Sequence, residues 1–369
     1  MKQKLLWLVS ILCVITLVTG CWDDRPVEER GLVLMLGISP SPHHGVTLYF
    51  EVPTSSGLTS LTSGGSSSSG GPKFVIYRGH GATFSDAFTD AQGQTNEDLY
   101  LGQTQVIALS TRLPPATFAV IDATLARLGP MDKSADAVAV TGSMAKFMAF
   151  SPAGTSLPGL YLASLFACHH CQTAQLARTV WSREKRLWSP TASVWVPKIS
   201  AHGSTFNVDR IVVYQGYRPV LVLTRRQTWD VGCLLGITVK APLTVSTSYG
   251  TISLRAVRAS PHFKTKPAPD GKILIHVTVH LSATLDSVPP NLLITTPILH
   301  EIEARADTLL SHRLLSILVT LQKAGSNPLG FGRRYVWVRQ DFSAWPTLYR
   351  HATLAVTAHI HIHQLGDLQ

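Results

Sequence analysis

A long amphipathic segment at residues 297–323 limits the folds open to this chain more than any other feature. Apolar residues recur in it every three or four positions, the spacing of one buried face of an α-helix. They are Ile298, Ile302, Ala306, Leu309, Leu310, Leu314, Ile317 and Leu321. Gly325 predicts where the helix ends. The segment therefore predicts one long helix with a single core-facing side.

The residues before and after this helix predict strands. In 273–281, Ile273 and every second residue after it are apolar, while His276, Thr278 and His280 alternate with them. A period of two is typical of a half-buried antiparallel strand. A terminal strand is predicted over 353–363.

The rest of the chain divides into shorter predicted elements. Strands are predicted at 31–38, 46–52, 73–77, 99–109, 137–141, 211–215 and 220–224, and helices at 83–92, 114–128, 143–150, 157–178 and 226–235. Residues 179–200 predict irregular structure. Most strands neighbour one another in sequence and the helices are irregularly interspersed, which favours an α+β fold with mixed or antiparallel sheets.

The first 21 residues have the pattern of an export signal. Lys2 and Lys4 precede an apolar stretch, 5–17, that is shorter than the roughly 20 residues of a transmembrane helix. The stretch ends in Val18-Thr19-Gly20-Cys21, which resembles a bacterial lipobox. In lipoproteins of that type the cysteine is lipidated and the preceding residues are removed, and two acyl chains suffice for stable anchoring. An ordinary signal anchor with a chance cysteine is the alternative.

Length and composition predict several domains. The 369 residues are 45% apolar and 15% charged, which is enough for two or three cores. We predict a signal peptide at 1–20, an N-terminal region at 21–200 with two subdomains, and a C-terminal domain at 201–369 that contains the long helix. The Gly/Ser-rich residues 54–72 predict a flexible loop with too little apolar surface to order itself.

The chain is basic. Its net charge is +10, and removing Lys2 and Lys4 with the signal leaves +8. A basic exported protein is attracted to anionic lipid headgroups or to an acidic partner. Export and the lack of a nucleic-acid-binding motif argue against a nucleic acid as partner.

Cys168-His169-His170-Cys171 is the strongest candidate for chemistry. Such a spacing can form a redox pair or half of a zinc site. Here it falls inside the helix predicted at 157–178, and no second CxxC or histidine pair at zinc-finger spacing accompanies it. A disulfide without function and two inert cysteines are the alternatives. With three cysteines after Cys21, the chain is no disulfide scaffold.

His359, His361 and His363 alternate with isoleucine in the terminal strand. Their side chains share one strand face, so they form a metal site only if a neighbouring strand adds a ligand. The simpler prediction is that the isoleucines point inward and the histidines are solvated. Protonation of the cluster would add positive charge to that face, which suggests a pH-sensing role as a hypothesis.

The residues directly after the predicted anchor and a charged stretch of the long helix each have a structural and a functional interpretation. Trp22 and Asp23 follow the predicted anchor, so they either contact the membrane surface or pack on the first domain. The charged stretch from Glu301 to Asp307 predicts a solvated helix face rather than paired catalytic acids. The sequence contains no nucleophile elbow, P-loop or HExxH motif, so no enzymatic activity is predicted.

An ordered set of motifs resembles the Ger(x)C (GerAC-like) family, the C-subunit lipoproteins of bacterial spore germinant receptors. The N-terminal motifs are Cys21-Trp22-Asp23, Gly37-Ile38, Gly81-Ala82-Thr83-Phe84 with Asp86-Ala87, the run Leu99-Tyr100-Leu101-Gly102, and Thr141-Gly142-Ser143-Met144-Ala145-Lys146. The C-terminal ones are the stretch 212–236, Gly330-Phe331-Gly332, and Trp345 with the strand that follows it. Gln103 and Asn327 stand where the family usually has histidine and aspartate.

The resemblance implies a three-domain fold and a non-enzymatic subunit without a cofactor. It implies anchoring to the lipid bilayer through Cys21 on the outer face of the spore inner membrane. It also implies assembly with membrane-embedded A and B subunits into a receptor that senses small nutrients and starts germination.

Two other functions compete with this one. A solute-binding lipoprotein should have two doubly wound lobes, and the neighbouring strand pairs argue against that. A metal or redox protein would use Cys168 and Cys171, or His359, His361 and His363.

Overall fold

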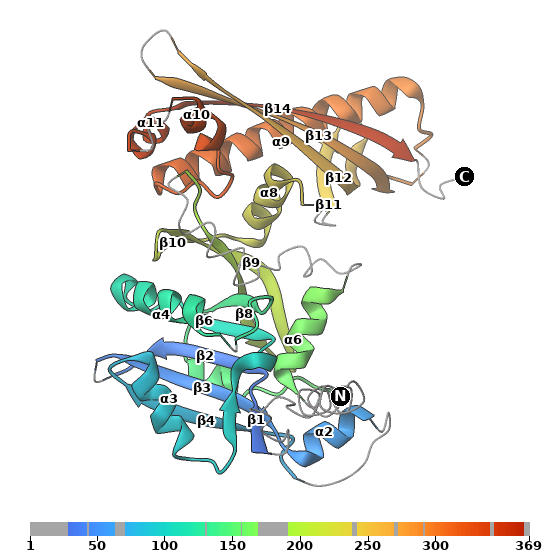
Figure 1. Cartoon of the computed structure of the whole chain (residues 1–369). Helices are drawn as coiled ribbons and strands as arrows, with labels where there is room; N and C mark the ends of the chain where they lie inside the picture. Colours follow the sequence, from blue (N-terminus) through green and yellow to red (C-terminus); the bar gives the residue numbers. More distant parts are fainter. Residues whose placement is uncertain are drawn as a thin grey trace, which may run out of the picture.

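The computed structural model describes residues 29–42, 44–62, 71–129, 131–155, 157–168, 191–237, 242–268, 272–290, 292–339 and 343–364. These residues form two lobes, each built around a sheet of its own. The N-terminal lobe lies at the bottom of Figure 1 and the C-terminal lobe at the top.

The N-terminal lobe contains most of the shorter elements. In chain order they are β1 (Arg30–Leu32), β2 (Met35–Pro40), β3 (Val46–Pro53), α2 (Ser55–Thr62), β4 (Phe74–Gly81), α3 (Phe84–Gln92), β5 (Asp98–Tyr100), the 3₁₀ turn η2 (Leu101–Gln103), β6 (Val106–Ser110), α4 (Pro115–Arg127), β7 (Asp136–Val140), α5 (Met144–Met148), α6 (Pro158–Ala167), β8 (Trp195–His202), β9 (Thr205–Gln215) and β10 (Arg218–Val222).

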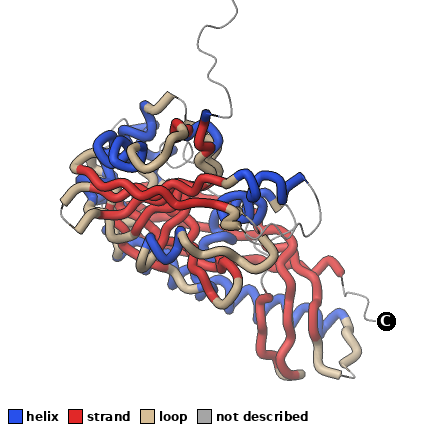
Figure 2. Tube along the Cα trace, turned by 90° about the horizontal axis from the view of Figure 1, so that it is seen from below, coloured by secondary structure: helices blue, strands red, loops and turns tan. Residues whose placement is uncertain are grey.

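Eight of these strands form one mixed sheet in the order β10-β9-β8-β7-β6-β2-β3-β4. The central strands β2, β6, β7 and β8 are parallel, and the outer ones are antiparallel. Alternate residues serve opposite faces: Leu36 packs with α3 and α4, whereas Met35 packs with α5 and α6. Figure 2 shows this strand layer with helices on either side.

The C-terminal lobe has a smaller sheet covered on one face. Its elements are α8 (Arg225–Leu235), β11 (Pro242–Thr247), β12 (Gly250–Pro267), β13 (Ile273–Ser287), α9 (Thr296–Lys323), α10 (Gly332–Arg339), α11 (Trp345–Arg350) and β14 (Thr353–Gln364). The sheet order is β11-β12-β13-β14, antiparallel except for the parallel pair β13–β14. Helices α9, α10 and α11 lie between these two parallel strands in the chain, and α9 packs on the inner face of the sheet (Figure 1).

The strongest periodic patterns are confirmed. Helix α9 begins one residue before the predicted start and ends at Lys323. In β13 every second residue from Ile273 to Leu285 is buried, and in β14 Ile360 and Ile362 are buried. The hairpin of β9 and β10 turns near Gly216, whose φ is +55°. The α+β fold class is therefore correct.

Two predicted strands are each divided in the structure. The segment 31–38 changes partners midway: Val33 donates its N–H to the Tyr100 carbonyl (3.1 Å), and Leu34 donates to that of Glu51 (2.9 Å). The segment 99–109 is interrupted by the η2 turn, which closes when Thr104 donates its N–H to the Leu101 carbonyl (3.1 Å). Both breaks depend on tertiary pairing that local periodicity does not contain.

Two regions predicted to lack regular structure also differ from the prediction. The Gly/Ser loop prediction is wrong for 55–62, where α2 begins after Thr54 accepts the Gly57 N–H through its hydroxyl (3.2 Å). Strand β8 lies in the stretch predicted as irregular. The predicted division between residues 200 and 201 lies within β8, whose sheet continues through β9 to β10, and the division itself stays a prediction.

Asn327 joins the two lobes. This buried side chain donates to the Thr191 carbonyl (2.8 Å), and its own carbonyl accepts the N–H groups of Gly330 (3.0 Å) and Phe331 (3.4 Å). Nearby, Ser326 donates its hydroxyl to the Tyr214 carbonyl of β9 (2.9 Å). The donating bond requires an amide, which fits asparagine at the position where aspartate is usual in the resembled family.

Candidate functional site

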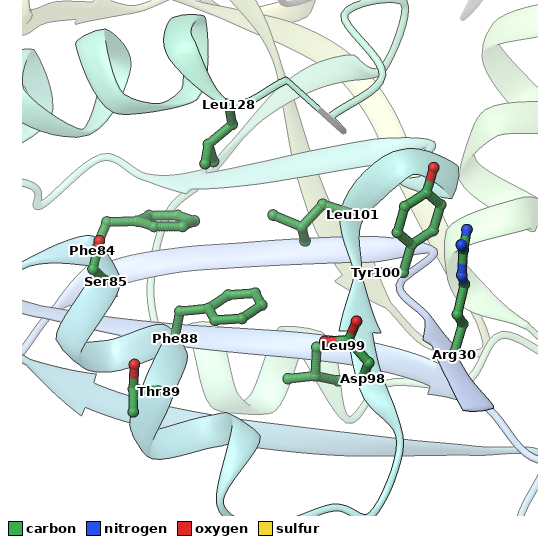
Figure 3. Close-up of a pocket in the computed structure, with 10 residues that line it drawn as sticks. All are labelled: Arg30, Phe84, Ser85, Phe88, Thr89, Asp98, Leu99, Tyr100, Leu101 and Leu128. Carbon is green, nitrogen blue, oxygen red and sulfur yellow. The ribbon is translucent and has the colours of Figure 1, made fainter. Parts of the chain in front are cut away.

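A cavity of about 490 Å³ opens between α3, β5 and the end of α4 (Figure 3). It is lined by Arg30, Phe84, Ser85, Phe88, Thr89, Asp98, Leu99, Tyr100, Leu101 and Leu128. Its volume is in the range of pockets that take small organic ligands or a protruding side chain.

Helix α3, one wall of the cavity, is fixed by its first turn and by close packing on β4. Thr83 and Asp86 form a capping box, in which each side chain accepts the backbone N–H of the other residue at 3.1 Å. Gly79 and Gly81 let the helix approach the strand, since a Cβ at either position would overlap the backbone of α3.

Aromatic rings make the cavity mostly apolar. The Phe84 and Phe88 rings stack with centroids 6.4 Å apart and extend from α3 toward Leu101, and Leu128 lies opposite them in Figure 3. At the other end the Arg30 guanidinium lies over the Tyr100 ring, 4.8 Å from its centroid. Such a site suits an apolar or aromatic group with a polar end. The lining contains no histidine or lysine that could take the hydroxyl proton of Ser85.

The sequence did not predict this cavity, although residues of two motifs named in the sequence analysis line it. Phe84 ends the motif that begins at Gly81, and Leu99, Tyr100 and Leu101 belong to the second motif. Each motif predicts local structure only. Their meeting depends on α3 folding back over β4 and on β5 pairing with β1.

The structure tests only part of the Cys168–Cys171 prediction. Helix α6 ends at Ala167 and Cys168 is its C-terminal cap, so Cys168 itself does not lie in the middle of a helix as predicted. Cys168 is half-buried and disulfide-bonded. Cys171 lies outside the described residues.

Cys233 on α8 is a buried thiol, 2% exposed. Burial raises its pKa well above the ordinary value, and Asp230 raises it further, so the thiolate is suppressed. We expect Cys233 to resist a thiol-exchange reagent at pH 8 in the folded chain and to react fully in denaturant. A Cys233→Ser variant isolates its signal from those of the other cysteines. Fast reaction in the folded chain would contradict this burial.

His359, His361 and His363 lie on the outer face of β14, as the simpler prediction has it. They belong to the histidine face, which we define as His262 of β12, His276 and His280 of β13, and these three residues. The rings of His262 and His280 have centroids 5.9 Å apart, and those of His280 and His359 are 5.2 Å apart. Among the described residues, no group of three or more His, Cys, Asp or Glu side chains is arranged to hold a metal.

Polar side chains of helix α9 accept backbone N–H groups of β14, which the sequence did not predict. Ser311, Asp307 and Glu303 accept the backbone N–H groups of Ala358 (2.8 Å), Ile360 (2.6 Å) and Ile362 (2.9 Å). These are the N–H groups at the outer edge of β14. Only Glu301 and Arg305 fit the predicted solvated face, where they pair at 2.9 Å. The spacing of four along α9 was the available signal, because it places all three acceptors on one face.

The predicted membrane-proximal residues Cys21, Trp22 and Asp23 lie outside the described residues, as does the signal segment. Within the described part of the chain, no helix has the length and apolar character needed to cross a bilayer.

Comparison with known families gives matches over most of the chain. A model described as "Spore germination protein N-terminal domain" matches residues 23–201, and one described as "Spore germination B3/ GerAC like, C-terminal" matches residues 210–366. No curated protein matches the sequence. A solved structure described as "Crystal Structure of the GerBC protein" shares the fold, with a TM-score of 0.52 and 13% identity. The alignment covers 88% of this chain and 96% of that one.

Proposed function

The chain belongs to the GerAC-like family of spore germination proteins, and we propose that it works as the lipid-anchored C subunit of a nutrient germinant receptor. The two family models, which follow one another with only residues 202–209 between them, are the observation that carries the proposal. The family is one of receptor subunits, not of enzymes, and implies association with a membrane and with other receptor subunits.

The proposed anchor is Cys21, lipidated after removal of residues 1–20. The lipobox-like ending supports it, and Trp22 and Asp23 would then lie at the headgroup level. The described fold starts at residue 29, which leaves a short connection between anchor and lobe. The chain would face the outside of the spore inner membrane.

The proposed partners are the membrane-embedded A and B subunits, bound through protein surfaces. The cavity beside α3 is a candidate for one contact, because it is lined by Phe84 and Phe88 and its volume of about 490 Å³ can hold an apolar side chain. No cofactor or metal is part of this proposal.

The structure weakens the main alternative. A solute-binding lipoprotein closes two doubly wound lobes around a ligand. Here the C-terminal sheet has four strands with helices on one face, and the cavity lies within the N-terminal lobe. The metal or redox alternative rests on Cys168, which is disulfide-bonded, and on Cys171, which lies outside the described residues.

Affinity purification of the tagged chain from gently solubilised spore membranes tests the proposal. We expect two membrane subunits to be recovered with it. A Cys21→Ala variant should lose membrane attachment and recover these subunits in reduced amount, because anchoring concentrates the chain at the bilayer.

A Glu29→Gln variant that keeps Cys21 is the matched control, since the anchor remains and Glu29 is an exposed residue outside the proposed headgroup contact. Recovery of the anchored chain without any membrane subunit would contradict the assembly proposal. Membrane attachment of Cys21→Ala at the level of the unchanged chain would contradict the anchor alone.

A further inference from the structure

The histidine face is an extended, positively charged surface. His262, His280 and His359 form a continuous row across β12, β13 and β14. His361 and His363 continue it along β14, with ring centroids 4.5 Å apart. Exposure of the His361 side chain is 69%, so this row is open to solvent within the described structure.

Three cations share this face. The β12–β13 register pairs Arg258 with Ser282, Lys264 with His276, and Lys266 with Leu274, which places all three on the side of the histidines. They are exposed. Asp286 is the one acidic residue in β11 to β14, and it pairs with Arg255. The face is therefore positive before any histidine is protonated.

The carboxylates of α9 offset the positive charge of the histidine face only at its β14 edge. Glu303 lies 3.3 Å from His361 and 3.5 Å from His300, and it also accepts the Ile362 N–H. Asp307 accepts the Ile360 N–H and lies near His359. Helices α8 and α10 pack against the inner side of β12 and bring no acidic group to the row. On the strands of the face itself the one carboxylate is that of Asp286, which pairs with Arg255 and leaves the positive charges of Arg258, Lys264 and Lys266 in place.

The shape of the charged area indicates its partner. Arg258 and Lys266 are eight residues apart on β12, a span of roughly 26 Å, and the three strands add about 10 Å of width. Its charges are spread along the sheet surface and do not converge on one point, as they would around a small anion. A planar, laterally continuous negative surface matches this distribution.

We propose that the histidine face binds an anionic lipid bilayer, weakly near neutral pH and more tightly as its imidazoles gain protons. Histidine side chains change charge between pH 5 and 8. Each added charge near an anionic membrane strengthens binding several-fold, and salt weakens the attraction. The binding is a property of the C-terminal lobe, so it does not depend on lipidation of Cys21.

Vesicle sedimentation tests the proposal on the chain from residue 21 onward, carrying Cys21→Ser. This form keeps every described element. Vesicles of phosphatidylcholine with phosphatidylglycerol are compared with phosphatidylcholine alone at pH 7.5 and pH 5.5. We expect partitioning onto the anionic vesicles to rise about tenfold or more at the lower pH. Added salt should reverse the rise. Neutral vesicles should show no rise.

Two triple variants distinguish binding through the histidine face from an effect of the total charge of the chain. His280→Gln/His359→Gln/His361→Gln should reduce the rise to about threefold or less. His202→Gln/His312→Gln/His351→Gln removes three exposed histidines outside the face and should keep the full rise. Thermal unfolding checks that both variants are folded.

Three outcomes would overturn the proposal. They are an equal rise in both triple variants, binding that does not change with pH, and binding to soluble polyglutamate with none to anionic vesicles. The last would identify an acidic polypeptide as the partner of this face.

Discussion

Replacing Arg313 with methionine is expected to lower the free energy of unfolding by about 3–5 kcal/mol. Arg313 of α9 donates to Asp230 of α8 at 2.6 Å, and the two side chains are only 15% and 4% exposed. The guanidinium also lies 4.9 Å from the centre of the Trp229 ring. Without Arg313 the carboxylate of Asp230 stays buried but has no cation beside it. The destabilisation caused by this unpaired buried charge is larger than the net stabilisation that the intact ion pair provides.

The pH dependence of this loss has a definite sign. Burial already raises the pKa of Asp230, and Arg313 opposes the rise. In the variant the carboxyl takes up a proton more readily, so the loss should shrink as pH falls. Urea unfolding at several pH values measures it.

The double variant Arg313→Met/Asp230→Asn is the matched control, because it removes both charges. It should recover a large part of the loss. A single-variant loss below about 1 kcal/mol at pH 7 would show that the pair does not hold α8 to α9.

Replacing Glu51 with glutamine is expected to stabilise the fold at pH 8 by about 2–3 kcal/mol and to have little effect at pH 5. Glu51 lies on β3, is 0% exposed, and accepts the Gly159 N–H at the start of α6 at 3.0 and 3.1 Å. Burial raises its pKa from 4.5 to about 7, against the smaller lowering effect of the Gly159 bond.

The sign of this effect follows from proton binding. The folded state holds the Glu51 proton up to about pH 7, whereas the unfolded chain releases it near 4.5. Stability contributed by Glu51 therefore rises as pH falls from about 7 to 4.5. Glutamine is neutral at every pH and can still accept the Gly159 N–H. The variant therefore avoids the destabilisation that the buried, ionised carboxylate of Glu51 causes at high pH.

Urea unfolding of Glu51→Gln between pH 5 and 8 measures this difference. Glu29→Gln, at an exposed position, is the control and should change nothing. Asp136, whose pKa burial raises to about 6, leaves a residual pH dependence of the same sign in both variants. A loss of stability in Glu51→Gln at pH 8 would show that the carboxylate is needed at Gly159.

The sequence predicts a helix or strand most accurately where a single buried face determines the spacing of its apolar residues. Helix α9 and strand β13 keep a single period over their length, so their buried faces are correct and the limits of α9 are correct to one residue. Strand β13 begins at the predicted Ile273 but continues to Ser287, beyond the predicted end at residue 281. The break between β1 and β2 is not predictable in this way, because Val33 and Leu34 are apolar and only their hydrogen-bond partners differ.

The functional surfaces depend still more on tertiary structure. The outward direction of His359, His361 and His363 follows from their alternation with isoleucine. Their stacking with His280 and His262 follows from strand register, which periodicity leaves open. The cavity beside α3 likewise requires β1 and β5 to pair across 65 intervening residues between Leu32 and Asp98. The predictions for Cys21, Trp22 and Asp23 stay predictions.

The three bonds from α9 to β14 restrict how the chain can assemble with others. A strand at the rim of a sheet ordinarily offers its free N–H groups to a strand from another molecule. Here Ser311, Asp307 and Glu303 already occupy those groups at Ala358, Ile360 and Ile362. A neighbouring subunit cannot extend the sheet at β14 by β-augmentation without displacing α9. Contacts on this side of the lobe must therefore be made by side chains across a face.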